Sequence, residues 1–176
     1  KLASTVTNYL NNRYNTEINV SRLKISPYGD FILRDVLIKD HHQDTLIYSK
    51  VIEGRIDKLT NLLNNGLFFS EVKFQNLDFN LVHYKGEKIT NIEVFGKSFS
   101  SNIPKKIYKP FTLETDKIVI NNSNFNYTNF NLKKSNILDF KKLNINASSF
   151  SLVGIDIITK IEYLSFHDSK APKIDK

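Results

Sequence analysis

The sequence predicts a mainly β protein, in which an N-terminal α-helix is followed by consecutive antiparallel strands and hairpins that form a curved sheet or groove. The apolar residues are rich in Ile, Val, Phe and Tyr, which favour strands. From Glu17 onward they recur with a period of two, as in strands that are buried on one face. With 176 residues, 40% of them hydrophobic, the chain is long enough to bury a core as one domain.

The first 15 residues are the best candidate for a helix. Leu2, Val6, Tyr9 and Leu10 fall at roughly helical spacing, with Ser4 nearby as a possible cap. Three strands are then predicted, over 17–25, 31–40 and 45–56, and the Pro and Gly of "SPYGD" (26–30) mark a turn between the first two.

A second, short helix is predicted near 57–65, because Asp57 stands at its start and Gly66 follows its end. The segment 96–110 is interpreted as an irregular loop, and 169–176 as a frayed end.

Beyond Gly66 three segments share one pattern: 72–81, 118–127 and 143–152. Each begins with apolar residues at alternate positions and places Phe79, Phe125 or Phe150 seven residues after the first of them. The parity of the apolar positions switches in the middle of each segment. A regular strand would therefore put the two halves on opposite faces.

Two structures resolve this switch. In the first, Gln75-Asn76, Asn121-Asn122 and Asn146-Ala147 are two-residue hairpin loops, so that Val72 pairs across from Phe79. In the second, each segment is one bulged strand. We favour the hairpin interpretation, and both give successive antiparallel strands with one apolar face.

Composition argues against several classes of function. The formal charge of +7 comes from scattered lysines, which indicates a solvated surface or attraction to anionic membranes more than a nucleic-acid face. There is no Cys, and the six glycines never cluster into a phosphate-binding loop. The sequence contains no stretch of 18 apolar residues, so it predicts no transmembrane helix. We expect no enzymatic activity and no cofactor.

The segment "DHHQD" (40–44) is the one cluster with possible metal-ligand chemistry. On an extended backbone, His41 and His42 point in opposite directions, so at most one of them can join Asp40 and Asp44. A metal usually takes three or four converging ligands. The sequence therefore predicts a polar turn between two strands, with no metal site.

The order and spacing of the segments resemble the N-terminal region of the TamB family, in the form found in Bacteroidota. The matching pieces are Leu23–Ile25, Leu33–Asp40, Asp44–Leu46, Leu59–Leu63 and Val72–Leu81. The likeness covers about residues 1–100. AsmA-like proteins of the same superfamily would show much the same pattern.

This resemblance implies a periplasmic, bridge-like lipid-transfer protein of Gram-negative bacteria with a repeating β-groove. Residues 1–15 would be a membrane-proximal helix that follows an inner-membrane anchor, and 16–176 would begin the groove. The implied partners are the inner membrane, phospholipid acyl chains and, through other parts of a longer chain, an Omp85-type outer-membrane barrel. The implied alternative role is a scaffold for outer-membrane protein assembly.

If the sheet curls around an acyl chain, the apolar residues of the three repeated segments would line the groove. These candidates are Val72, Phe74, Phe79, Leu81, Ile118, Ile120, Phe125, Tyr127, Leu143, Ile145, Phe150 and Leu152. From the residues alone, the same faces could equally pack on each other as an ordinary sandwich core. That alternative stays open at the level of sequence.

Overall fold

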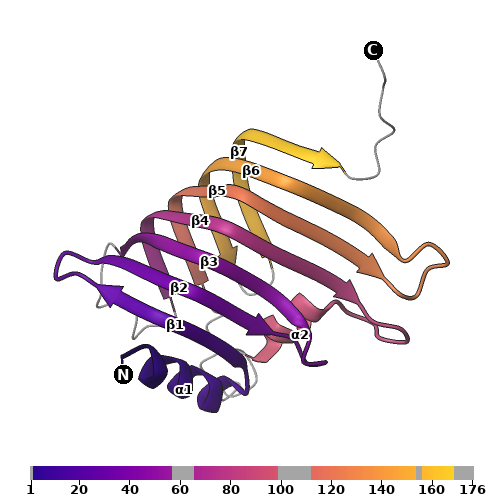
Figure 1. Cartoon of the computed structure of the whole chain (residues 1–176), viewed down its shortest axis with the longest axis horizontal. Helices are drawn as coiled ribbons and strands as arrows, with labels where there is room; N and C mark the ends of the chain where they lie inside the picture. The colour runs from indigo at the N-terminus through magenta and orange to yellow at the C-terminus, as the bar shows by residue number, and fades with distance from the viewer. Residues whose placement is uncertain (1, 57–65, 99–111, 154–155, 169–176) are drawn as a thin grey trace.

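The computed structural model describes residues 2–56, 66–98, 112–153 and 156–168. They form one seven-stranded sheet in which the strands follow each other in chain order, with two helices (Figure 1). The elements are α1 (Leu2–Tyr14), β1 (Glu17–Ile25), β2 (Asp30–Lys39), β3 (Thr45–Ile56), β4 (Gly66–His83), α2 (Asn91–Ser98), β5 (Thr112–Asn129), β6 (Asn136–Val153) and β7 (Asp156–Asp168).

The mainly β class, the first helix and the first three strands are confirmed. The helix predicted near 57–65 and the end at 169–176 lie outside the described residues. The predicted loop at 96–110 is wrong at its start, because residues 96–98 belong to α2, and its remainder also lies outside the described residues.

The hairpin interpretation of the three repeated segments is wrong. Each segment lies inside one long strand of 18 residues, β4, β5 or β6. Val72 therefore does not pair across from Phe79: it pairs with Ile118 and Gly54, while Phe79 pairs with Phe125 and Ile47. The alternative of a bulged strand is the structure that the chain adopts.

A line of irregular backbone across the sheet explains the switch in parity in β4 and β5, whereas the switch inside the segment 143–152 of β6 falls at Ser149 (φ 56°). Asp35 (φ 48°), Asn76 (φ 51°), Asn122 (φ 45°) and Lys142 (φ 50°) all have left-handed conformations within strands. The pairing of β1 through β5 skips this line; further irregularities lie away from it, at Ile38/Lys39 and Arg55/Ile56. We call this line the crease; it consists of Ser21, Asp35, Lys50, Asn76, Asn122 and Lys142.

At the crease the alternation of side chains between the two faces shifts by one residue in each strand. Successive side chains on the apolar face are therefore three residues apart there instead of two. In β1 the step is from Val20 to Leu23, and in β4 it is from Phe74 to Leu77. The same face of the sheet is therefore apolar on both sides of the crease. Asn and Asp are suited to this line because they tolerate positive φ better than most residues.

Side chains replace the backbone hydrogen bonds that the crease interrupts. The backbone N–H of Leu77 donates to Ser123 Oγ at 3.0 Å, and Ser123 Oγ donates to the Asn121 carbonyl at 2.9 Å. The backbone N–H of Asn122 donates to Asn144 Oδ1 at 2.9 Å. Ser123 is fully buried, so its hydroxyl satisfies groups that water does not reach.

The pairing of β4 with β5 is parallel, whereas the sequence predicted antiparallel strands throughout. The other five pairings are antiparallel. A parallel pair needs a connection from one end of the sheet to the other, and the chain between His83 and Thr112 supplies it, with α2 inside it.

The sheet is strongly curved and open. Figure 1 shows that the long strands turn over along one side, so that parts of β4 to β7 lie behind the rest. Bulged positions bend strands and increase their twist, so the crease contributes to this curvature. At one end of the strand order, α1 lies beside β1, where Asn11 Nδ2 donates to the Ile18 carbonyl and Asn11 Oδ1 accepts from the Ile18 N–H, both at 2.8 Å.

Candidate functional site: the apolar face

One face of the sheet carries rows of apolar residues that run across the strands. Residues that pair directly across neighbouring strands point to the same side. One such row crosses all seven strands and consists of Leu23, Leu33, Ile52, Phe74, Ile120, Ile145 and Leu164. We call the side on which this row lies the apolar face.

A second row of this face, on the other side of the crease, is built from aromatic rings. The ring centroids of Phe79 and Phe125 are 5.5 Å apart, those of Phe125 and Phe140 are 6.2 Å apart, and those of Phe140 and Phe166 are 4.2 Å apart. These four rings come from four successive strands, β4 to β7. Neighbouring rings at such distances stabilise strand pairing and form a continuous apolar surface.

A third row depends on a glycine. Phe31, Gly54 and Val72 pair across β2, β3 and β4. The Phe31 ring lies over Gly54, since a Cβ added there would be 2.9 Å from Phe31 Cζ. Phe31 also contacts Phe69, with a centroid distance of 5.4 Å. The glycine therefore lets an aromatic ring cover the face where a side chain would have pushed it away.

The structure brings the predicted groove residues of β4, β5 and β6 side by side in register. Val72 and Leu143 are buried. The half-buried members are Phe74, Phe79, Leu81, Ile118, Ile120, Phe125, Tyr127, Ile145 and Phe150. Leu152 lies in β6 and pairs with Leu113, but its side chain is outside the described part of the molecule.

Sequence reasoning missed the members of the face that lie outside the repeated segments. Leu33, Ile52, Phe140 and Leu164 belong to the same rows. The signal was present in the sequence, because β1 to β3 show the same switch of apolar parity as the repeats.

The pattern of burial indicates that the apolar face is the concave side of the sheet. Bending crowds side chains on the inner side of a sheet and spreads them on the outer side. The buried residues Val36, Val72, Leu143 and Ala147 all belong to the apolar face, and so do the buried hydroxyls of Ser49 and Ser123. Because most of its large side chains are only half-buried, this concave face is not sealed as a core.

The opposite face is more polar, although Ile32, Leu37, Val51 and Val119 also lie on it. Glu71 accepts salt bridges from Lys73 and Lys117, each at 2.9 Å. The hydrogen bond from Lys73, followed by that from Lys117, lowers the pKa of Glu71. Gln75 Nε2 donates to Glu53 Oε1 at 2.7 Å. The two faces therefore differ in chemistry.

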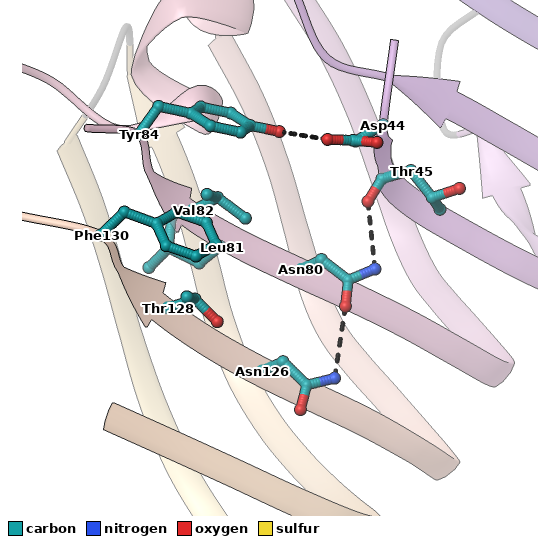
Figure 2. A pocket seen from close by; sticks show the side chains of 9 residues that line it. All are labelled: Asp44, Thr45, Asn80, Leu81, Val82, Tyr84, Asn126, Thr128 and Phe130. Atoms are coloured by element: carbon teal, nitrogen blue, oxygen red, sulfur yellow. Dashed lines mark hydrogen bonds between the residues drawn. The ribbon is translucent and has the colours of Figure 1, made fainter. Parts of the chain in front are cut away.

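A shallow pocket of about 320 Å³ lies near the ends of β4 and β5 (Figure 2). Its walls include the rings of Tyr84 and Phe130. In Figure 2 the side-chain amide of Asn126 donates to Asn80 Oδ1 at 3.2 Å, and Asn80 Nδ2 donates to the Thr45 carbonyl at 3.0 Å. These amides are engaged with each other, and the Tyr84 hydroxyl donates to Asp44 Oδ2 at 2.9 Å.

The segment 40–44 forms the predicted polar turn between β2 and β3. The expectation that its two imidazoles diverge is wrong. Nε2 of His41 and Nε2 of His42 both lie within hydrogen-bond distance of the Glu87 carboxylate. The expectation assumed extended backbone, whereas residues 41–43 are in a turn and Gln43 has a φ of 68°.

The fold and its site define the chain as an open, curved β-sheet protein with an apolar concave face and a polar back. Comparison with known protein families and with curated proteins gave no match. In the part of the chain that the structure describes, no helix is long and apolar enough to cross a membrane.

Proposed function

We propose that this chain carries phospholipid acyl chains along the concave apolar face, as the membrane-proximal segment of an inner-membrane-anchored, bridge-like protein of the periplasm. The observation that carries the proposal is the continuous row from Leu23 to Leu164, which crosses every strand of an open sheet. The described strands form one sheet, and most large side chains of this face are only half-buried, which supports a face that is open to a ligand.

The energetics of the face suit an acyl chain. Its large side chains are half-buried in the protein alone, so a ligand can remove more apolar surface from water. Burial of each methylene contributes about 0.8 kcal/mol, so a few methylenes offset part of the cost of leaving a bilayer. Such a ligand needs no directed polar contact, which matches a face made of aliphatic and aromatic side chains.

The proposed periplasmic location and the proposed anchor in the inner membrane rest on the resemblance to the TamB family. The net charge of +7 supports approach to a surface of anionic lipid. An acyl carrier needs no catalytic group, and we propose that the chain is not an enzyme.

Lipid binding can be tested directly. The purified chain is incubated with vesicles that contain a fluorescently labelled phospholipid, then separated by size exclusion in the absence of detergent. We expect labelled lipid to migrate with the protein, and Phe79→Asp or Phe125→Asp to abolish it, because a charge would enter the middle of the ring row.

The matched control is Val119→Asp. Val119 lies on β5 between Ile118 and Ile120 but pairs with Lys73 and Asn146 on the polar face. This variant should still bind lipid, and circular dichroism checks that all variants are folded. If the wild-type chain carries no lipid, or if Val119→Asp loses lipid as completely as Phe125→Asp does, the proposal is wrong.

A second candidate function is a scaffold for outer-membrane protein assembly, and the exposed strand β7 favours it. Ile158 is 72% exposed and Ile161 is 53% exposed. Among the described strands, none pairs with the outer edge of β7. Exposed edges recruit additional strands. A photo-crosslinker at position 160 should then capture a β-barrel protein in cells, with no loss when Phe125→Asp removes lipid.

A further inference from the structure

Away from the apolar face, we propose that His41, His42 and Glu87 bind a transition-metal dication, with Zn²⁺ as the candidate. Nε2 of His41 lies 3.0 Å from Glu87 Oε2, and Nε2 of His42 lies 2.7 Å from Glu87 Oε1. The three potential ligand atoms lie within 4.8 Å of one another. Ligand atoms in a tetrahedral zinc site are about 3.3 Å apart, so small movements of these side chains would bring the three atoms to that spacing.

The turn that carries the two histidines is fixed by Asp40. The backbone N–H of Asp40 donates to the Asp44 carbonyl at 2.9 Å. In the other direction, Asp40 Oδ1 accepts hydrogen bonds from the N–H groups of His42 and Asp44, at 2.9 and 3.1 Å. This arrangement replaces extended backbone with a tight turn and points both imidazoles to the same side.

The loop that carries the carboxylate is held independently. The N–H of Glu87 donates to the Tyr84 carbonyl at 3.2 Å, and Gly86 has a φ of 81°, which closes a turn. Asn131, from the loop between β5 and β6, accepts from the Gly86 N–H at 2.8 Å and donates to the Tyr84 carbonyl at 3.1 Å. The loop of the third ligand is therefore held by backbone and amide hydrogen bonds that involve Tyr84, Gly86 and Asn131.

Tyr84 connects the two turns. Its ring centroid is 3.8 Å from that of His42, and its hydroxyl donates to Asp40 at 2.8 Å and to Asp44 at 2.9 Å. Burial, then the hydrogen bonds to Asp40 and Asp44, raise the pKa of Tyr84, so the phenol stays neutral. Tyr84 thus supports the imidazoles from behind and is not itself a ligand.

The donor set suits zinc. Two imidazole nitrogens and one carboxylate oxygen form three protein ligands, and zinc sites with three protein ligands accept water or another molecule in the fourth position. Both oxygens of the Glu87 carboxylate lie within 3.1 Å of His41 Nε2, and Oε1 lies 2.7 Å from His42 Nε2, so the carboxylate faces both imidazoles. The side chains are 29%, 44% and 28% exposed, which leaves a path for the ion.

Isothermal titration of the whole chain with ZnCl₂, after treatment with a chelator, tests the proposal. We expect one ion per chain at pH 7.5, and weaker binding at pH 5.5 because protonated imidazole does not bind metal. His41→Ala, His42→Ala and Glu87→Gln should each weaken binding by about 100-fold or more, since loss of an outer-shell partner alone costs 10- to 100-fold.

The matched control is His167→Ala, which removes an exposed histidine from β7 and should bind zinc like the wild type. As a second measurement, zinc should raise the melting temperature of the wild type and of His167→Ala but not of His42→Ala. If the wild type binds no zinc, or if the three ligand variants bind as well as the control does, the three residues form only a surface ion pair and the proposal is overturned.

Discussion

The backbone N–H of Leu77 on β4 donates to Ser123 Oγ on β5 at 3.0 Å. This bond stands where the ladder between the two parallel strands skips from Gln75–Asn121 to Asp78–Asn124. A side chain thus occupies the place of a backbone carbonyl, at the point where both strands rotate. Because the rotation occurs at the same level in neighbouring strands, the sheet bends without breaking its apolar face.

Ser123→Ala should destabilise the fold. Ser123 is fully buried, and its loss leaves the Leu77 N–H and the Asn121 carbonyl without this partner. An unsatisfied buried polar group costs about 1–3 kcal/mol, and we expect that decrease in the free energy of unfolding measured with urea. The control Ser148→Ala removes only an exposed hydrogen bond to Glu162, so a similar decrease in both variants would contradict this role for Ser123.

Substitutions at Asn76 test how much the left-handed backbone conformation at the crease contributes to the free energy of unfolding. At a φ of 51°, glycine fits without strain, whereas a β-branched residue is strongly disfavoured. Asn76→Val should lower the free energy of unfolding by at least about 1–2 kcal/mol, and Asn76→Gly should change it much less. Equal loss in the two variants would show that the backbone conformation is not what selects the residue.

Gly54→Ala should be among the most damaging small substitutions in the described sheet. The added Cβ would meet the Glu71 carbonyl oxygen and lie 2.9 Å from Phe31 Cζ. Forcing extra atoms into a packed position costs about 1–3 kcal/mol or more. The double variant Gly54→Ala/Phe31→Leu should recover little, because the backbone contact with Glu71 remains; full recovery in urea unfolding would contradict this.

Stability should fall in acid through Asp40. Burial alone would raise the pKa of this carboxyl, but hydrogen bonds from Asn91, Tyr84 and the N–H groups of His42 and Asp44 hold it below its usual range. The stabilisation is fully present above the unfolded-state pKa of about 3.9 and is lost as the pH falls through the lower folded-state pKa.

Unfolding measured between about pH 5 and pH 2 checks this dependence. Asp40→Asn should be less stable at neutral pH, since an amide group faces donors, and its stability should fall less in acid. Tyr84→Phe keeps the carboxylate and removes one donor, so its acid dependence should be intermediate. An unchanged acid dependence in Asp40→Asn would assign the effect to other carboxyls.

Local patterns were enough to predict the class of fold, the first helix and the first three strands. In β1, for example, Ile18 and Val20, and then Leu23 and Ile25, alternate with polar residues, and the Gly-containing turn after it has a clear sequence signature. The apolar positions of β4 to β6 were also recognised from alternation, but left-handed residues that interrupt the alternation bring the two halves of each strand to one face.

The sequence could not decide how the parity switch at Asn76 and Asn122 is resolved. A two-residue hairpin loop and a left-handed residue within a strand impose the same switch, and Asn is suited to both. Tertiary pairing decides between them: Val72 aligns with Ile118 and Phe79 with Phe125, so a continuous strand buries apolar residues along its whole length.

The histidine pair also separates what the sequence determines from what only the tertiary structure determines. The sequence by itself determined that residues 40–44 form a polar turn, because clustered Asp, His and Gln do not continue an apolar strand. Only the tertiary structure brought Glu87 to the two imidazoles, since a turn makes neighbouring side chains converge and the second loop is about 45 residues away in the chain. Periodicity fixes which face a residue lies on, whereas contacts between distant loops depend on how the strands pair.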